Sequence, residues 1–154
     1  MSDILEKFSL KGQTALVTGG AGLLGKQFTL ALGQAGANVV VADFDLDAAQ
    51  RHAQTLLNEN IPAQAAQVDV TQPGSVAKMV EQAVSKFGRL DILVNSAALD
   101  PKFDPENISD QSSNAFETYP LESWQKAIDV NLTGMFLACQ ASARQMVEQN
   151  YGVI

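Results

Sequence analysis

The sequence has only one cysteine, few basic residues and no long apolar run. A single thiol, Cys139, cannot form a disulfide within the chain. Only 10 lysines and arginines stand against 17 aspartates and glutamates, giving a net charge of -7. No nucleic-acid partner is expected, because binding phosphates requires clustered basic side chains. No apolar run reaches the roughly 20 residues that span a bilayer, and residues 1–10 lack a signal-peptide pattern, so we expect a cytoplasmic protein without a membrane partner.

The single histidine and the single cysteine indicate no metal site. His52 lies on a predicted helix beside Arg51, with no second ligand at metal-binding spacing, and is interpreted as a surface residue. Cys139 falls in an apolar helical stretch, where a buried structural thiol is expected. We therefore expect no bound metal.

Short apolar runs alternate with longer amphipathic segments along the chain. Strands are predicted at 15–17, 39–42 and 92–94, with a weaker candidate at 64–68. None of the three strong runs alternates apolar with polar residues, so both faces of each strand should be buried, as in a parallel sheet with helices on two sides. Apolar residues at helical spacing predict helices from Leu23 to Gly36 and over 46–57, 76–87 and 124–147.

This alternation predicts an α/β fold, a doubly wound parallel sheet of the Rossmann type. With 154 residues, the chain is long enough for one core and too short for two, so residues 1–154 are treated as one dinucleotide-binding domain. A long polar loop is expected over 99–114, after the strand at 92–94. It is either a flap on the substrate side or a plain surface insertion.

A glycine-rich turn, Thr18-Gly-Gly-Ala-Gly-Leu-Leu-Gly25, joins the first predicted strand to the first helix. Glycines allow the backbone to turn sharply and let a pyrophosphate approach without meeting a Cβ atom. The free amides at the helix start, with the positive end of the helix dipole, then face the phosphates. The cofactor-binding residues predicted here are Gly19, Gly22, Leu23, Leu24 and Gly25.

Asp43 directly follows the second predicted strand, 18 residues beyond Gly25. A carboxylate at this place accepts hydrogen bonds from the adenosine ribose hydroxyls and repels a 2′-phosphate, so NAD is favoured over NADP. Phe44, its neighbour, is assigned to the same site. The alternative is that Asp43 caps the next helix, but Asp45 already stands at the capping position.

These motifs together resemble the short-chain dehydrogenase/reductase family over residues 10–154. Asp69-Val70 is similar to the acidic pair that contacts adenine in that family, and Asn95-Ser-Ala-Ala98 resembles its Asn-Asn-Ala-Gly segment. Asn131 matches the family's helix asparagine, which helps to hold a catalytic lysine through water. The resemblance thus implies cofactor contacts by Asp69, Val70, Asn95 and Ala97 and a supporting catalytic role for Asn131. A polar residue that bonds only to backbone is the alternative for Asn131.

Two departures from the family pattern bear on function. The glycine spacing, with Gly22 present and Leu23 where the shorter-chain branch usually has glycine, resembles the extended branch of sugar-nucleotide epimerases and dehydratases. The segments around Asn95 and Asn131 resemble the shorter-chain oxidoreductases and favour that branch. The family's catalytic serine and its tyrosine with a lysine four residues later are also missing, because Tyr119 is followed by Ser123 and Tyr151 by the chain end.

The resemblance implies hydride transfer between a nicotinamide and a secondary alcohol or ketone, such as a sugar, a polyol or a small hydroxy compound. We expect this chain to supply the cofactor-binding half and to be inactive alone, with residues 151–154 approaching a fifth strand. A non-catalytic NAD-binding module is the alternative. The helix over 124–147 is apolar on two sides, so it needs a second partner besides the sheet. In the family that partner is commonly another subunit, which implies a homodimer or homotetramer.

Overall fold

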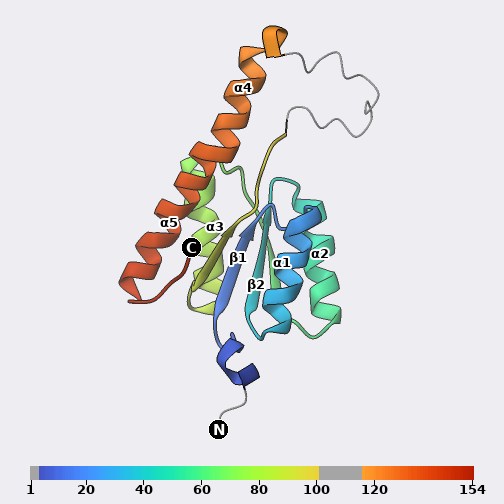
Figure 1. Cartoon of the computed structure of the whole chain (residues 1–154). Helices are drawn as coiled ribbons and strands as arrows, with labels where there is room; N and C mark the ends of the chain where they lie inside the picture. Colours follow the sequence, from blue (N-terminus) through green and yellow to red (C-terminus); the bar gives the residue numbers. More distant parts are fainter. Residues whose placement is uncertain (1–3, 101–115) are drawn as a thin grey trace.

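The computed structural model describes residues 4–100 and 116–154 (Figure 1). The polar loop predicted over 99–114 therefore lies, apart from Leu99 and Asp100, outside the described residues. The strands are β1 (Thr14–Thr18), β2 (Asn38–Asp43), β3 (Ala63–Gln67) and β4 (Ile92–Asn95). The helices are α1 (Leu23–Gln34), α2 (Leu46–Asn58), α3 (Pro73–Phe87), α4 (Leu121–Ile128) and α5 (Met135–Glu148).

All four strands are parallel and lie in the order β3-β2-β1-β4. The side chains of β2 show why the sheet is covered on both sides. Val39 and Val41 pack into a core with residues of α2, whereas Val40 and Ala42 pack into a second core with residues of α3 and α5. Successive side chains of a strand point to opposite faces, so each face carries its own core. The predicted burial of both faces is confirmed (Figure 1).

The element boundaries follow local signals more closely than apolar spacing alone. Asp45 caps α2, because its carboxylate accepts a hydrogen bond from the amide of Ala48 at 3.0 Å, as expected. α3 begins at Pro73, earlier than the first apolar residue of its stripe, and proline suits the first helical turn. β3 runs one residue earlier than predicted.

The uninterrupted helix expected over 124–147 is divided by a π-helical segment, Asp129–Gly134, between α4 and α5. Gly134 lies against Val70 of the neighbouring loop, and a Cβ atom on it would come within 2.7 Å of Val70 Cγ2. The segment therefore packs closely on the loop that follows β3, and a side chain at position 134 would force Val70 to move. Such π-helical turns often occur at functional sites. None of the helices described in the structure has the length and hydropathy needed to cross a membrane.

His52 is half-buried, so its interpretation as a simple surface residue is wrong. Its Nε2 atom lies 2.7 Å from Oγ1 of Thr29, a fully buried residue of α1. The contact joins α1 to α2 on one face of the sheet. It could not be read from the sequence because the two residues are on different helices.

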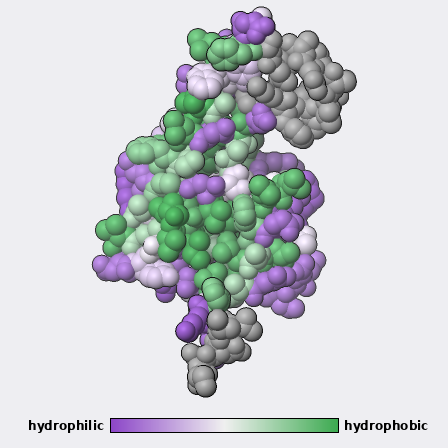
Figure 2. Space-filling model, in the orientation of Figure 1, coloured by the Kyte–Doolittle hydropathy of each residue, from purple (hydrophilic) through white to green (hydrophobic). Residues whose placement is uncertain are grey.

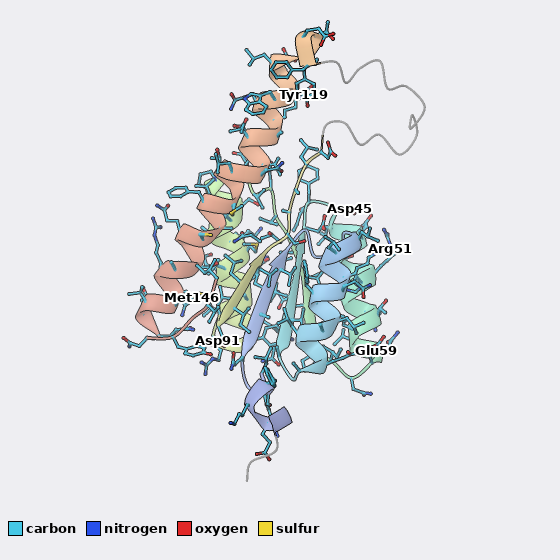
Figure 3. All side chains as sticks on the ribbon, in the orientation of Figure 1. Asp45, Arg51, Glu59, Asp91, Tyr119 and Met146 are labelled. Atoms are coloured by element: carbon cyan, nitrogen blue, oxygen red, sulfur yellow. The ribbon has the colours of Figure 1, made fainter. Side chains whose placement is uncertain are left out.

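The carboxylate of Asp91 is fully buried at the amino end of β4, on the lower side of the sheet (Figure 3). It accepts hydrogen bonds from the Thr14 amide at 2.9 Å, from Nε and Nη2 of Arg89 at 2.7 Å each, and from Nε2 of Gln149 at 3.2 Å. The hydrogen bonds between Arg89 and Asp91, together with the negative charge of Asp91, raise the pKa of the Arg89 guanidinium. One carboxylate thus joins the start of β1, the start of β4 and the end of α5.

The segment after α5 returns to the edge of β4. The Leu93 amide donates to the carbonyl of Val153 at 3.0 Å, and the Val153 amide donates to the carbonyl of Asp91 at 2.8 Å. Val153 forms a parallel bridge with Ile92, and β1 pairs with the other edge of β4. The expected approach to a fifth strand is confirmed at this bridge.

Replacing the buried carboxylate should weaken the whole fold. Asp91→Ala leaves the Thr14 amide without an acceptor, while Arg89, whose side chain is 46% exposed, regains water. We expect the free energy of unfolding to fall by about 2–4 kcal/mol, and Asp91→Asn to lose roughly half as much because it keeps one acceptor. Urea unfolding followed by circular dichroism measures this. Glu81→Ala, on the exposed side of α3, is the control, and an equal loss in both alanine variants would contradict the assignment.

Candidate functional site

The predicted cofactor residues come together at one edge of the sheet. The glycine turn follows β1, Asp43 ends β2, and the segment from Asn95 follows β4, so all lie at the carboxyl ends of parallel strands. β1 lies between β2 and β4 in the sheet. After β1 the chain builds β2 and β3 on one side of it, and it then returns to build β4 on the other side. Open α/β sheets bind ligands in the crevice at such a reversal of strand order.

The glycine turn is built against its neighbours. Gly19 has a φ of +63°, which favours glycine, and a Cβ atom on it would come within 2.8 Å of Ala97 Cα. The Gly20 amide donates to the Ala42 carbonyl of β2 at 2.9 Å. A Cβ atom on Gly25 would collide with the Gly19 carbonyl oxygen. The glycines are therefore required for close packing of the turn on the strand ends.

The first turn of α1 leaves its amides free. Gly22 caps the helix without a side chain, and within the described part of the chain the amides of Leu23, Leu24 and Gly25 find no acceptor. The side chains of Leu23 and Leu24 are 88% and 62% exposed beside them. An anion at this helix end would meet three N–H donors and the positive end of the dipole. The residues present therefore fit a pyrophosphate group.

Asp43 is in direct contact with the glycine turn. Its Oδ2 accepts a hydrogen bond from the Ala21 amide at 3.0 Å, and its Oδ1 accepts one from the Asp45 amide at 3.1 Å. A carboxylate oxygen has two acceptor positions, so each oxygen keeps one for a ligand hydroxyl. Because Asp45 caps α2, Asp43 is not the cap of that helix. Phe44 is exposed next to it.

Thr18 has no role in the sequence analysis, but its side chain fixes the chain segments at this edge of the sheet. Its side chain is buried, and its Oγ1 accepts hydrogen bonds from the amides of Ser96 and Ala97 at 3.2 Å each. The hydroxyl thus fixes the chain leaving β4 over the start of the glycine turn. The only available signal was a hydroxyl residue at the last position of the strand, just before Gly19.

A cavity of about 400 Å³ lies beside the end of β2, between β3 and α3. Six of its lining residues are Phe44, Leu46, Asp69, Ser75, Lys78 and Gln82. The Oδ1 atom of Asp69 accepts hydrogen bonds from the amide and hydroxyl of Thr71, at 3.0 and 2.7 Å. Its Oδ2 atom has no partner among the residues that the structure describes and is open to a ligand donor. Val70 instead is buried in the core against Gly134.

Asn95 lies at the end of β4 and points toward α5. Its Nδ2 atom lies 3.3 Å from Sγ of Cys139, and its Oδ1 atom is buried with no partner in the described part of the chain. Cys139 is expected to be a buried structural thiol; it packs against the core but is only half-buried. The unpaired oxygen is a polar group that a bound ligand or water would satisfy.

Asn131 lies in the π-helical segment and holds the chain that leaves β4. Its Oδ1 accepts a hydrogen bond from the Leu99 amide at 2.7 Å, and its Nδ2 donates to the Leu99 carbonyl at 2.9 Å. The side-chain amide is thus paired with backbone from a distant segment. Its supporting role in catalysis stays a prediction. In the described ranges, 4–100 and 116–154, no three His, Cys, Asp or Glu side chains are grouped so that they could hold a metal ion.

Known proteins resemble both the sequence and this geometry. The family model described as short chain dehydrogenase matches residues 13–154. The 5-keto-D-gluconate 5-reductase of Escherichia coli (strain K12) is 33% identical over 96% of this chain and 54% of its own length. The D-threitol dehydrogenase of Mycolicibacterium smegmatis is 32% identical over 96% of this chain and 52% of its own length.

A solved structure agrees with these matches. The crystal structure of a short-chain type dehydrogenase/reductase from Mycobacterium marinum is 36% identical, with a TM-score of 0.83, over 96% of this chain and 55% of that one. The chain therefore spans about half the length of these relatives. With the glycine turn, the parallel sheet and a family model that covers almost all residues, the chain belongs to the short-chain dehydrogenase/reductase family of oxidoreductases.

Proposed function

We propose that this chain is the NAD-binding half of an oxidoreductase that transfers hydride between a nicotinamide and a secondary alcohol or ketone. The observation that carries the proposal is the contact between the Asp43 carboxylate and the Ala21 amide. This contact fixes the Asp43 carboxylate, which would accept hydrogen bonds from the ribose, beside the start of α1, where a pyrophosphate would bind. When bound, the nicotinamide supplies the hydride chemistry, and the protein's share is binding and orientation.

The preference for NAD over NADP rests on the charge of Asp43. Its two oxygens each have one acceptor position left, which suits the two hydroxyls of an adenosine ribose. A 2′-phosphate at the same place would be repelled by the carboxylate. Among the described residues, no lysine or arginine forms an ion pair with Asp43 that would neutralise this charge.

The adenine is assigned to the cavity beside β3. Phe44 offers an exposed aromatic ring at its rim, and the free Oδ2 of Asp69 is an acceptor for the exocyclic amine. On the other side of the cleft, Ala97 and Asn95 lie where the chain crosses Gly19, so they would face the nicotinamide half. Thr18 fixes this crossing through its two hydrogen bonds.

The substrate class is inferred from the relatives. One is a 5-keto-D-gluconate reductase and another is a D-threitol dehydrogenase, each about one-third identical to this chain. One name gives a keto derivative of a sugar acid as the substrate, and the other gives a polyol. We therefore propose a sugar or polyol as substrate for the whole protein, with Asn131 positioning the segment that leaves β4.

The long helix provides the surface for a second copy of the chain. Trp124, Leu132 and Phe136 are 55–60% exposed along α4, the π-helical segment and α5. Hydrophobic side chains gather over this helix and the sheet edge beside it (Figure 2). Neighbouring exposed apolar side chains often mark interaction surfaces, so we propose a homo-oligomer that packs through this helix.

Nucleotide binding tests the role of Asp43. We expect the chain to bind NADH more tightly than NADPH, and Asp43→Asn to weaken NADH binding roughly 10- to 100-fold, since hydrogen bonds to a charged acceptor are lost. NADH fluorescence titration measures both affinities. Asp47→Asn removes the same charge from an exposed position on α2 and should leave them unchanged. Tighter NADPH binding by the unaltered chain would refute the preference.

Turnover tests the division of roles. In the 154-residue sequence neither tyrosine is followed four residues later by lysine, so the tyrosine–lysine pair that relays the substrate proton in the family is not formed. We expect the chain to bind NADH but not to consume it when keto sugars are added. We also expect it to form no NADH from NAD when polyols are added. NADH absorbance follows both directions. Steady turnover by purified material would show that the proton is handled by residues within this chain.

Sedimentation velocity tests the oligomer. Phe136→Lys places a charge in the apolar surface and should shift an associated chain to the monomer. Leu57→Lys adds the same charge at an exposed apolar position of α2, on the other face of the sheet, and should have no effect. A wild-type chain that stays monomeric at high concentration would contradict association through this helix.

A further inference from the structure

A groove between α1 and α2 gathers positive charge on a strongly acidic protein. It has a volume of about 290 Å³ and is lined by Lys26, Ala48, Arg51, His52 and Thr55. Arg51 lies on the outer side of α2, between Asp45 before the helix and Glu59 after it (Figure 3). The groove does not include the free amides of the α1 start or the Asp43 carboxylate.

The two permanent cations of this groove are Lys26 and Arg51. Lys26 and Arg51 form no ion pair with any residue in the described ranges, although acidic residues outnumber basic ones by 17 to 10. Both side chains are exposed, so they are free to turn toward a ligand. The guanidinium of arginine has donors spaced for two oxygens of a phosphate, and lysine adds a point charge.

His52 forms the inner wall of the groove and is held in place. Its Nε2 lies 2.7 Å from Thr29 Oγ1, and that hydroxyl lies 2.9 Å from the carbonyl oxygens of both Gly25 and Lys26. The remaining ring nitrogen, Nδ1, has no partner in the described part of the chain. It becomes a donor when the ring is protonated.

The surroundings of His52 favour its neutral form. Burial lowers the pKa of His52 below its ordinary value of 6.5, and the charge of Lys26 lowers it further. Glu59 acts in the opposite direction but is the smallest of the three influences. Arg51 is the other charged group lining the groove. Stability linked to neutral His52 is therefore complete above pH 6.5 and is lost as the pH falls toward the lowered pKa.

We propose that Lys26, Arg51 and His52 form a binding site for a phosphate-class dianion, separate from the dinucleotide cleft. Two fixed cations match a dianion, and a third group gains its proton when the dianion arrives. The source is either free inorganic phosphate or the phosphate monoester of a nucleotide. The site does not depend on the proposed cofactor or reaction, since none of its side chains takes part in either.

Because the chain has a single histidine, nuclear magnetic resonance reports on this site without ambiguity. The His52 ring signal is titrated with pH in sodium sulfate and in sodium chloride of equal ionic strength. Sulfate is used because it stays a dianion throughout. We expect sulfate to raise the pKa of His52 by about 0.5–1 unit relative to chloride, as a nearby opposite charge favours the protonated ring. Equal pKa values in the two salts would overturn the proposal.

The variants separate a site from general screening. Lys26→Gln and Arg51→Gln should each reduce the sulfate response at least about threefold, because each removes one of two fixed charges. Lys86→Gln removes a charge from α3, on the opposite face of the sheet, and should leave the response unchanged. A response that survives in both groove variants, or that falls equally in Lys86→Gln, would refute the site.

Two further probes identify the source of the dianion. Inorganic phosphate and 2′-AMP are titrated at constant pH and ionic strength while the His52 signal is followed. Similar saturation by both supports a free-phosphate site, and at least tenfold tighter binding of 2′-AMP supports a nucleotide monoester. No saturable shift with either probe would overturn the proposal. NADH affinity is measured on the same samples, so failure of the groove is distinguishable from failure of the dinucleotide site.

Discussion

The rest of the structure depends on how β1 is fixed to β4 at both ends. At the amino end, the buried carboxylate of Asp91 accepts a hydrogen bond from the Thr14 amide. At the carboxyl end, the Thr18 hydroxyl accepts hydrogen bonds from the amides of Ser96 and Ala97. Polar groups buried in this way must be satisfied, so the register of the two strands has little freedom. The glycine turn that leaves β1 is consequently placed beside the chain that leaves β4.

A second set of bonds fixes the same turn to β2. The Gly20 amide donates a hydrogen bond to the Ala42 carbonyl, and the Ala21 amide donates one to the Asp43 carboxylate. The residue assigned to the ribose therefore also holds the loop assigned to the pyrophosphate. Binding and fold share these interactions, which preorganises the site and reduces the ordering that a ligand would otherwise have to induce. Family membership agrees with this arrangement, because the family model covers residues 13–154.

Charge is distributed unevenly around this edge. Asp43 and Asp69 present free acceptor positions toward the cleft, while Lys26 and Arg51 lie together in the groove between α1 and α2. In an acidic protein, unpaired cations at one groove attract anions selectively, whereas the carboxylates of the cleft favour hydroxyl and amine donors. The groove lies on the face of the sheet that α1 and α2 cover, whereas the cleft lies at the carboxyl ends of the strands, and the two regions have opposite preferences.

The sequence by itself determined the alternation of strands and helices, the glycine turn, the strand-end position of Asp43 and the cap at Asp45. Each depends on neighbours within a few residues, through apolar spacing, glycine conformation or a local hydrogen bond. Only the tertiary structure decided the role of Thr18, the π-helical segment at Asn131 and the contact of His52 with Thr29. These arise between segments that are 23 or more residues apart in the chain, where packing selects partners that no local pattern encodes.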